Sequence, residues 1–133
     1  MTTPTRMTYE DARALLNGGR YGVLAAVGDG DTPYGVPLCY LSEKHRIWFC
    51  LHPDGQLSRL LSYRNRVSFT AVEAGAALPG RSVIAFGEIA PLTDPRQKKA
   101  ALQKWIDKYG APPDPDAIWW RMDCEYLSGQ VRA

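Results

Sequence analysis

The sequence predicts a mainly β fold with flanking helices, an α+β domain in which six antiparallel strands close into a small barrel. Two observations support this prediction. Five of the six strand-like runs come before the one long amphipathic helix pattern, and many neighbouring runs are joined by tight turns. Connections this short can join antiparallel strands, whereas a parallel crossover needs about a dozen residues or more. We therefore expect a barrel with helices packed outside it rather than alternating βαβ units.

Length, charge and cysteine content narrow the class of protein. The chain has 133 residues, which fits a single domain over residues 1–133. A formal net charge of +2 gives no reason to expect nucleic acid or a membrane surface as a partner. No apolar run approaches the roughly 20 residues that cross a bilayer, and the N-terminus lacks a signal-peptide pattern. The three cysteines match no zinc or disulfide framework, so we expect a cytoplasmic protein in a reducing compartment.

The first helix and the first strand are marked by capping and turn residues. Thr8 starts an S/T-x-x-D/E pattern, so it is expected to cap a helix. That helix should stop at residues 17–19, where two glycines permit a left-handed exit. The apolar run 21–27 lacks helical spacing and is expected to be the first strand, closed by a turn at residues 28–31.

The next two strands are expected to form a hairpin. Residues 33–41 resume a strand pattern, although Pro33 and Pro37 mean that at least part of it cannot be a central, fully bonded strand. Residues 42–45 are expected to form a four-residue hairpin turn. Residues 46–51 are then the third strand.

The middle of the chain is expected to hold a short helix and two further strands. The helix should cover residues 56–63. Residues 66–72 alternate between apolar and polar side chains, which is typical of a fourth strand. A Gly- and Ala-rich loop is expected at residues 73–80, followed by the fifth strand at residues 82–89.

The long helix has the clearest start and stop signals in the chain. Asp94 is a favourable cap, and Pro95 suits the first helical position. One apolar stripe then follows at i, i+3, i+4 and i+7: Leu102, Trp105, Ile106 and Tyr109. Residues 110–115 are rich in Gly and Pro and end the helix. The last apolar run, residues 118–127, alternates from Trp120 onward and is expected to be the sixth strand.

Two adjacent tryptophans, Trp119 and Trp120, raise the question of what covers them. Neighbouring residues on a strand face opposite sides of a sheet. One of the two indoles is therefore expected to be unusually exposed, unless a ligand or a second subunit covers it.

Cys50 and His52 stand at the end of the third strand with one residue between them. Side chains two apart on a strand point to one face, so the pair could begin a metal site or a nucleophilic site. No CxxC or HxxxH pair accompanies it, however, and no third residue that would orient the histidine can be named. The cysteines are most simply interpreted as small buried apolar residues, and we predict no metal site.

The turn before the short helix is a candidate for binding phosphate. The first turn of a helix has free N–H groups that attract anions, and Gly55 would let the backbone approach one closely. Further donors follow in the same turn: Gln56, Ser58 and Arg59. Arg81 and Ser82 add a cation and a hydroxyl at the start of the fifth strand. The alternative for both segments is an ordinary turn and a solvated strand end.

The order and spacing of these segments resemble a known family. The segments are YGVLA at 21–25, PYGVPL at 33–38, IWF at 47–49, Gly55 with the helix after it, NRVSF at 65–69, RSVIAFG at 81–87, the long helix and LSGQ at 127–130. The chain resembles the flavin-binding split-barrel proteins related to pyridoxamine 5′-phosphate oxidase, and within them the nitroimidazole-resistance (Nim-like) branch. The resemblance covers nearly the whole chain.

This resemblance implies a six-stranded antiparallel split barrel that forms a homodimer, with one FMN in each of two sites at the subunit interface. Residues 36–40 would line the isoalloxazine ring, and residues 50–58 would follow the ribityl chain and the phosphate. The segment 81–83 would lie nearby, and C-terminal aromatic residues of the partner could cover the ring. The implied cofactor-binding residues are Val36, Pro37, Leu38, Cys39, Tyr40, Cys50, Leu51, His52, Gly55, Gln56, Leu57, Ser58, Arg59, Arg81, Ser82 and Trp119.

The chain departs from the Nim-like pattern at two positions. Cys50 stands where relatives usually have histidine, which argues against a Nim-type antibiotic-reducing role. Leu57 stands where they usually have lysine, which removes a point charge from the expected phosphate site. Arg59 or Arg81 could substitute, because a guanidinium can grip phosphate with two parallel bonds.

Three functional hypotheses follow. The first is an FMN-dependent oxidoreductase that passes electrons to a small organic substrate, with the ring held by backbone groups around residues 37–39 and no protein acid or base identified. The second is a split barrel that holds flavin, deazaflavin or haem without turnover, with His52 or His45 as the candidate haem ligand. The third is binding of single-stranded nucleic acid by aromatic stacking, against which the near-neutral charge argues.

Overall fold

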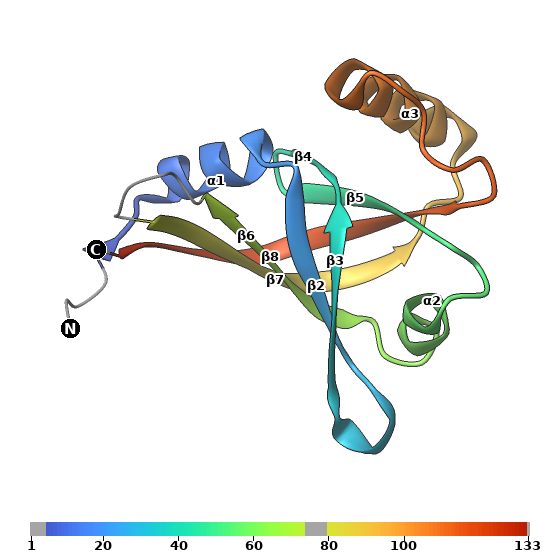
Figure 1. Ribbon diagram of the computed structural model, residues 1–133, viewed down its shortest axis with the longest axis horizontal. Helices are drawn as coiled ribbons and strands as arrows, with labels where there is room; N and C mark the ends of the chain where they lie inside the picture. The colour runs from blue at the N-terminus through green and yellow to red at the C-terminus, as the bar shows by residue number, and fades with distance from the viewer. Residues whose placement is uncertain (1–4, 74–79, 133) are drawn as a thin grey trace.

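The computed structural model describes residues 5–73 and 80–132. Within these residues, one antiparallel sheet curls into an open half-barrel, and its strands follow one another in the order β3-β2-β6-β7-β8-β5-β4 (Figure 1). The short strand β1 pairs with β8. The strands are β1 (Thr5–Arg6), β2 (Tyr21–Val27), β3 (Pro33–Cys39), β4 (Leu41–Glu43), β5 (Arg46–Leu51), β6 (Arg66–Glu73), β7 (Gly80–Pro91) and β8 (Ile118–Arg132). The helices are α1 (Tyr9–Gly18), the 3-10 turn η1 (Asp29–Asp31), α2 (Gln56–Leu61) and α3 (Pro95–Tyr109).

The predicted fold class is confirmed, but the main sheet has seven strands instead of six. The difference arises at Tyr40, where the predicted second strand splits into β3 and β4. The hydroxyl of Tyr109 on α3 accepts a hydrogen bond from the Tyr40 N–H at 3.2 Å and donates one to the Tyr40 carbonyl at 2.6 Å. A side chain of α3 thus satisfies the backbone of this residue between the two strands. The predicted turn is correspondingly shorter, because Ser42 and Glu43 belong to β4.

Strand β3 lies at an edge of the sheet, as its two prolines predicted. At the opposite edge lies β4, which has only three residues. The long strands β7 and β8 extend beyond their predicted bounds. A bulge interrupts their ladder, because Gly87 pairs with Cys124 whereas Phe86 pairs with Tyr126.

The start of α1 is confirmed and its predicted exit is wrong. The Thr8 hydroxyl accepts a hydrogen bond from the Asp11 N–H at 3.1 Å. Gly19 follows the helix in an extended conformation, with φ of −76°, instead of a left-handed one. Only glycine leaves enough room at this position, because the Cβ atom of any other residue would lie 2.2 Å from the Tyr40 hydroxyl. That hydroxyl donates to the carbonyl of Leu16 at 2.5 Å.

The limits of α3 match the prediction. Asp94 caps the helix by accepting a hydrogen bond from the Arg96 N–H at 2.9 Å, and Pro95 is the first helical residue. Gly110 ends it in a left-handed conformation, with φ of 79°. Helix α2 is two residues shorter than predicted. The predicted loop at residues 73–80 falls mostly on residues 74–79, which lie outside the described residues.

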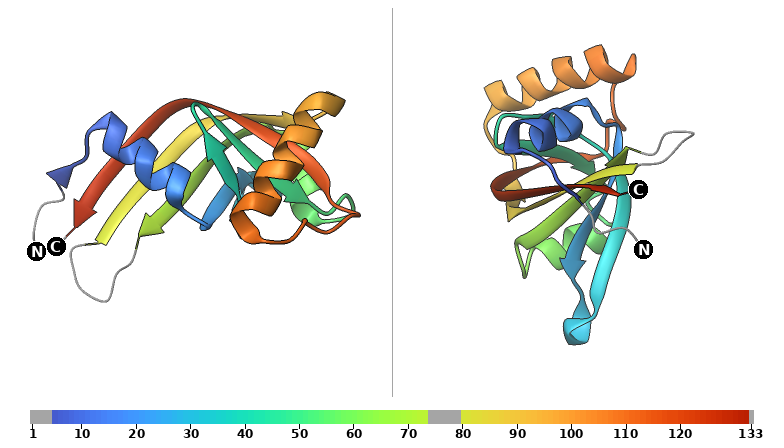
Figure 2. Two further views of the ribbon diagram at one scale, coloured as in Figure 1. Left: turned by 90° about the horizontal axis from the view of Figure 1, so that it is seen from above. Right: turned by 90° about the vertical axis from the view of Figure 1, so that its left-hand side faces the viewer.

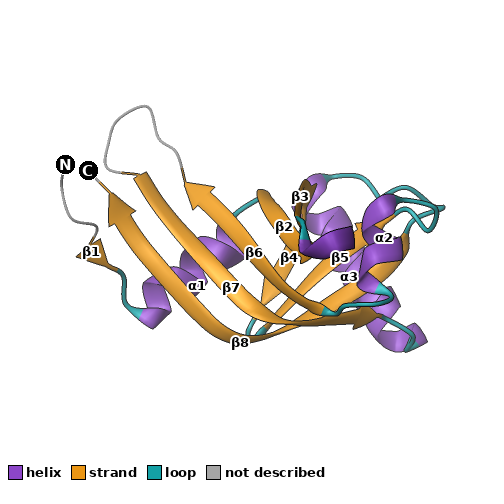
Figure 3. Cartoon of the chain, turned by 90° about the horizontal axis from the view of Figure 1, so that it is seen from below, coloured by secondary structure: helices purple, strands orange, loops and turns teal. Residues whose placement is uncertain are grey.

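The main core fills the concave side of the half-barrel, where α1 and α2 close it (Figures 1 and 2). Its centre is aromatic: the Tyr40 and Phe49 rings lie 4.6 and 5.1 Å from the Phe69 ring, and all three side chains are fully buried. In Figure 3, α1 lies behind β6, β7 and β8, and no helix covers the near side of their long free ends. No described helix combines the length and apolar character needed to span a bilayer.

Helix α3 packs on the outside of the barrel and explains the two tryptophans. Trp120 is buried in the main core. Trp119 faces the other way and meets the Trp105 ring edge-on, with 5.7 Å between ring centres. The expectation that one indole would need a ligand or a second subunit to cover it is therefore wrong. A helix of the same chain provides the cover, in a small cluster with Leu41 and Ala101.

Candidate functional site

Two neighbouring rows of residues cross the convex side of the sheet from β3 through β2, β6 and β7 to β8. The first row is Pro37, Val23, Thr70, Ile84 and Ser128. The second row is Gly35, Ala25, Ser68, Phe86 and Tyr126. All ten residues lie on the face opposite the main core, and we call them the open face.

The open face has an apolar centre that remains in contact with solvent. Val23, Phe86 and Tyr126 are 43, 40 and 51% exposed, and the Phe86 and Tyr126 rings lie 5.9 Å apart. Next to Phe86 the surface becomes charged, because Arg66 on β6 forms ion pairs with Glu88 and with Glu125. An exposed apolar patch bordered by charged residues is typical of a contact surface.

Only part of the predicted ring-binding segment, residues 36–40, faces this surface. The side chains of Val36 and Leu38 pack against the main core, and Tyr40 is fully buried in it. Pro37 belongs to the open face, and Cys39 lies beside it against the α3 cluster. The structure therefore leaves alternate residues of the segment available to a ligand.

A pocket of about 370 Å³ lies where β2 ends, between the η1 hairpin and α2. Two ion pairs join the η1 hairpin to α2 and to the segment just after it. Arg59 of α2 meets Asp29 at 2.9 Å, and Arg64 just after α2 meets Asp31 at 2.6 Å. Sequence reasoning missed both aspartates, which stand in a turn whose composition gives no sign of a partner.

The predicted phosphate-binding residues of α2 lie beside this pocket, and several are engaged within the chain. The Ser58 hydroxyl is buried and donates to the His52 carbonyl at 2.7 Å. Leu57 is a core residue, and Gln56 accepts a hydrogen bond from the Arg59 guanidinium at 3.4 Å. Gly55 is the N-cap of α2 and has no side chain with which to bind the helix. The one guanidinium of this turn, that of Arg59, thus already meets a carboxylate in the single chain.

Arg81 lies at the other end of the sheet from α2. It pairs in the β6–β7 ladder with Glu73, the last residue of β6, whereas α2 leads into the first residue of that strand. The guanidinium binds both oxygens of Glu73, at 3.0 and 2.6 Å, and this holds the pKa of Glu73 below its usual value. Ser82 lies on the same side of β7 as the open face. One chain does not bring Arg59 and Arg81 together.

Cys50 and His52 do not form the paired site that their spacing suggested. Cys50 faces Trp119 across the β5–β8 ladder, and the intervening Leu51 belongs to the core. His52 is exposed, and its Nδ1 accepts a hydrogen bond from the Asp54 N–H at 3.3 Å, which shapes the turn before α2. Across residues 5–73 and 80–132, no three His, Cys, Asp or Glu side chains gather as a metal site would require.

Two of the thiols are expected to be inert. Burial raises the pKa of Cys50 to about 12, and it raises the pKa of Cys124 to about 12 with a further contribution from Asp123. At pH 8 we expect alkylation of both by iodoacetamide to be roughly a thousandfold slower than that of an ordinary thiol, because only the thiolate reacts. Peptide mass spectrometry after timed labelling measures this. Labelling in urea is the control, and equal rates with and without urea would contradict the prediction.

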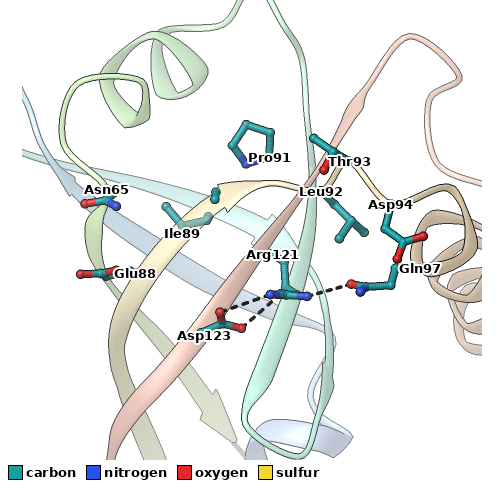
Figure 4. Close-up of a pocket in the computed structure, with 11 residues that line it drawn as sticks. Asn65, Glu88, Ile89, Pro91, Leu92, Thr93, Asp94, Gln97, Arg121 and Asp123 are labelled. Carbon is teal, nitrogen blue, oxygen red and sulfur yellow. Dashed lines mark hydrogen bonds and ion pairs between the residues drawn. The ribbon is translucent and has the colours of Figure 1, made fainter.

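A second pocket, of about 330 Å³, surrounds Arg121 at the junction of β7, β8 and α3 (Figure 4). The Arg121 guanidinium donates to Gln97 at 2.7 Å and forms an ion pair with Asp123 at 3.1 Å. Sequence reasoning did not select this arginine, although its place between the apolar Trp120 and Met122 could have drawn attention to it. Asp123 neutralises the guanidinium, so the pocket presents no net positive charge.

A third pocket, of about 280 Å³, is lined in part by His45, Tyr9 and Tyr126. The Tyr9 hydroxyl lies 2.9 Å from Nδ1 of His45, which fixes the imidazole ring. The other ring nitrogen has no hydrogen-bond partner among the described residues, so it is the nitrogen that could meet a ligand.

Comparisons with known proteins identify the family. The pyridoxamine 5′-phosphate oxidase family model matches residues 8–131, almost the whole chain. The chain belongs to the pyridoxamine 5′-phosphate oxidase family. No curated protein matches the chain.

Solved structures of similar fold include proteins described as binding different cofactors. An FAD-binding protein from Mesorhizobium loti has a TM-score of 0.82 at 24% identity, over 99% of this chain and 100% of that one. A protein from Bacteroides thetaiotaomicron, assigned to 5-nitroimidazole antibiotic resistance, has a TM-score of 0.86 at 14% identity, over 97 and 87%. A heme-binding protein from Mycobacterium smegmatis has a TM-score of 0.75 at 18% identity, over 96 and 54%. At these identities the likeness to these three structures establishes the fold alone.

Proposed function

We propose that the protein binds a flavin between two copies of the chain and serves as an oxidoreductase acting on a small organic molecule. The observation that carries the proposal is the open face, an uncovered apolar surface in a chain of the pyridoxamine 5′-phosphate oxidase family. FMN is the flavin that the sequence resemblance implies. The proposal places the protein in the cytoplasm, where its three free cysteines would stay reduced.

The separation of the predicted cofactor residues supports a homodimer. Pro37 and Ser82 lie on the convex side of the sheet, Arg59 lies on α2, and Cys50 pairs with Trp119, which packs against α3. These residues therefore lie in three different parts of one chain. A two-fold contact through the open face presents each set of residues twice, so residues from both chains can meet one ligand.

In the proposed complex the flavin and the protein have different roles. The flavin, when bound, supplies the redox chemistry. Val23, Ile84 and Phe86 would exclude water, while the hydroxyls of Ser68 and Thr70 would orient polar groups of the ligand. The raised pKa values of Cys50 and Cys124 keep both thiols protonated at neutral pH, so neither is proposed as a nucleophile.

Identification of the bound chromophore tests this proposal. The visible spectrum of the purified protein is expected to show an oxidised flavin, and mass spectrometry of the released molecule would distinguish FMN, FAD and a deazaflavin. Bleaching by a reduced nicotinamide under anaerobic conditions is the expected sign of redox competence. A colourless protein that takes up neither FMN nor riboflavin would contradict the proposal.

His45 supports a second candidate, a haem carrier or sensor without turnover. Its ring is held by Tyr9 at one nitrogen and lines a pocket, as a haem ligand would. This function predicts a haem spectrum that His45→Ala abolishes and His52→Ala leaves intact. A flavin spectrum that His45→Ala leaves unchanged would rule out this candidate. The third hypothesis, single-stranded nucleic acid, would require salt-dependent binding to an oligonucleotide.

A further inference from the structure

We infer that Asp29 and Asp31 are specificity determinants that prevent the chain from recognising the terminal phosphate of a flavin. The protein would then bind riboflavin about as tightly as FMN. This inference rests on the proposed flavin-binding function and adds to it which part of the cofactor the chain recognises. It is carried by the two ion pairs that join the η1 hairpin to α2.

The backbone of the hairpin places the two aspartates on one tight turn beside α2. The Gly28 N–H donates to the Thr32 carbonyl at 2.6 Å, which closes the hairpin. Gly30 and Asp31 both adopt left-handed conformations, with φ of 67° and 60°, so the tip is tightly turned. Asp29 and Asp31 lie on either side of Gly30, and each forms an ion pair with its own arginine, Arg59 or Arg64.

The charges in this pocket cancel. Arg59 and Arg64 contribute two positive charges, and Asp29 and Asp31 contribute two negative ones. A phosphate that approaches Arg59 must displace the Asp29 carboxylate or share the guanidinium with it. In either case the Asp29 carboxylate remains close to the phosphate and repels it, and Asp31, two residues along the same turn, adds to the repulsion. All four side chains are partly exposed, so each ion pair is weak by itself, and charge compensation is the effect that matters.

The other predicted side chains of α2, those of Gln56, Leu57 and Ser58, add no positive charge. The Ser58 hydroxyl already donates to the His52 carbonyl, and Leu57 is buried in the core. The helix has six residues, roughly one and a half turns, so its dipole adds little to anion binding. Arg81, the remaining predicted phosphate ligand, is held by both oxygens of Glu73 at the far end of β6.

Parallel titrations of the full-length protein with FMN and riboflavin test the inference, with quenching of flavin fluorescence as the readout. The two dissociation constants are expected to agree within about threefold. Asp29→Asn removes the charge opposite Arg59, and the variant is expected to bind FMN about tenfold more tightly than riboflavin, as one added charge-assisted bond would give. The double variant Asp29→Asn, Arg59→Gln should lose this preference. Asp107→Asn, which removes an exposed carboxylate on α3, is the matched control and should behave as the wild type.

The measured affinities for FMN and riboflavin distinguish a failure of this inference from a failure of the proposed function. Wild-type protein that binds FMN about thirtyfold or more tightly than riboflavin would overturn the inference and leave the proposed function standing. If Arg81→Ala then abolished that preference, Arg81 would be the phosphate ligand. An Asp29→Asn variant with unchanged selectivity would also overturn the role of Asp29. A wild type that binds neither flavin would overturn the proposed function, and this inference with it.

Discussion

The proposed dimer through the open face predicts that replacement of Phe86 by aspartate leaves the protein monomeric at concentrations at which the wild type would pair. Phe86 is 40% exposed, and its row partners on the open face are Ser68 and Tyr126. In a two-fold contact each substitution occurs twice, so two unpaired carboxylates would enter one interface. Burial of an unpaired charge costs several kcal/mol, so the dimer dissociation constant should rise by about a thousandfold or more. Sedimentation equilibrium measures this constant directly.

Leu102→Asp provides a matched control for this substitution. Leu102 is 37% exposed, which is close to the value for Phe86, but it lies on α3 away from the open face. The Leu102→Asp variant should therefore dimerise as the wild type does. A Phe86→Asp variant that remains dimeric would show that the chains meet through another surface. A monomeric Phe86→Asp variant that still binds flavin with unchanged affinity would show that the cofactor does not lie between the chains.

Replacement of Phe69 by alanine is expected to lower the free energy of unfolding by about 3–5 kcal/mol. Phe69 is fully buried on β6, and its ring lies between those of Tyr40 and Phe49. It also occupies the space beside Gly22, where a Cβ atom would lie 2.2 Å from the Phe69 ring. Tyr40, Phe49 and the backbone at Gly22 therefore lose contacts at once, and the surrounding rings cannot close the cavity fully. Urea denaturation followed by circular dichroism measures the change.

Tyr63→Ala is the control for the loss of an aromatic side chain as such. Tyr63 is 80% exposed after α2, so its removal should change stability by less than about 0.5 kcal/mol. Comparable losses in Tyr63→Ala and Phe69→Ala would contradict the assignment of Phe69 to the centre of the core. An unchanged slope of the urea transition would show that the denatured state is the same in both variants.

The parts of the fold that were predictable from the sequence are those set by local chemistry. The caps Thr8 and Asp94 act within one helical turn, and the left-handed Gly110 ends the helix that it follows. The break at Tyr40 was not predictable in this way. The residue that satisfies its backbone, Tyr109, is 69 positions away along the chain, and only the docking of α3 brings it there.

The candidate site was less predictable because it depends on strand register and on partners. Alternation identifies which residues share a face, but it does not show that Val36 and Leu38 point inward while Pro37 points outward. In the sequence Arg59 has no visible partner, whereas in the structure the η1 hairpin brings Asp29 into an ion pair with it. For the same reason Trp119 could be recognised as needing cover, whereas the identity of its cover could not.

The two edges of the sheet have a consequence for aggregation. A sheet with a free edge can add strands from other molecules without limit, which leads to polymers. Here Pro33 and Pro37 remove hydrogen-bond donors from β3, and β4 at the other edge has only three residues. Neither edge is a good template for another strand. The apolar surface of the sheet can therefore take part in self-association face to face, which ends at two chains, while growth edge to edge into fibres is disfavoured.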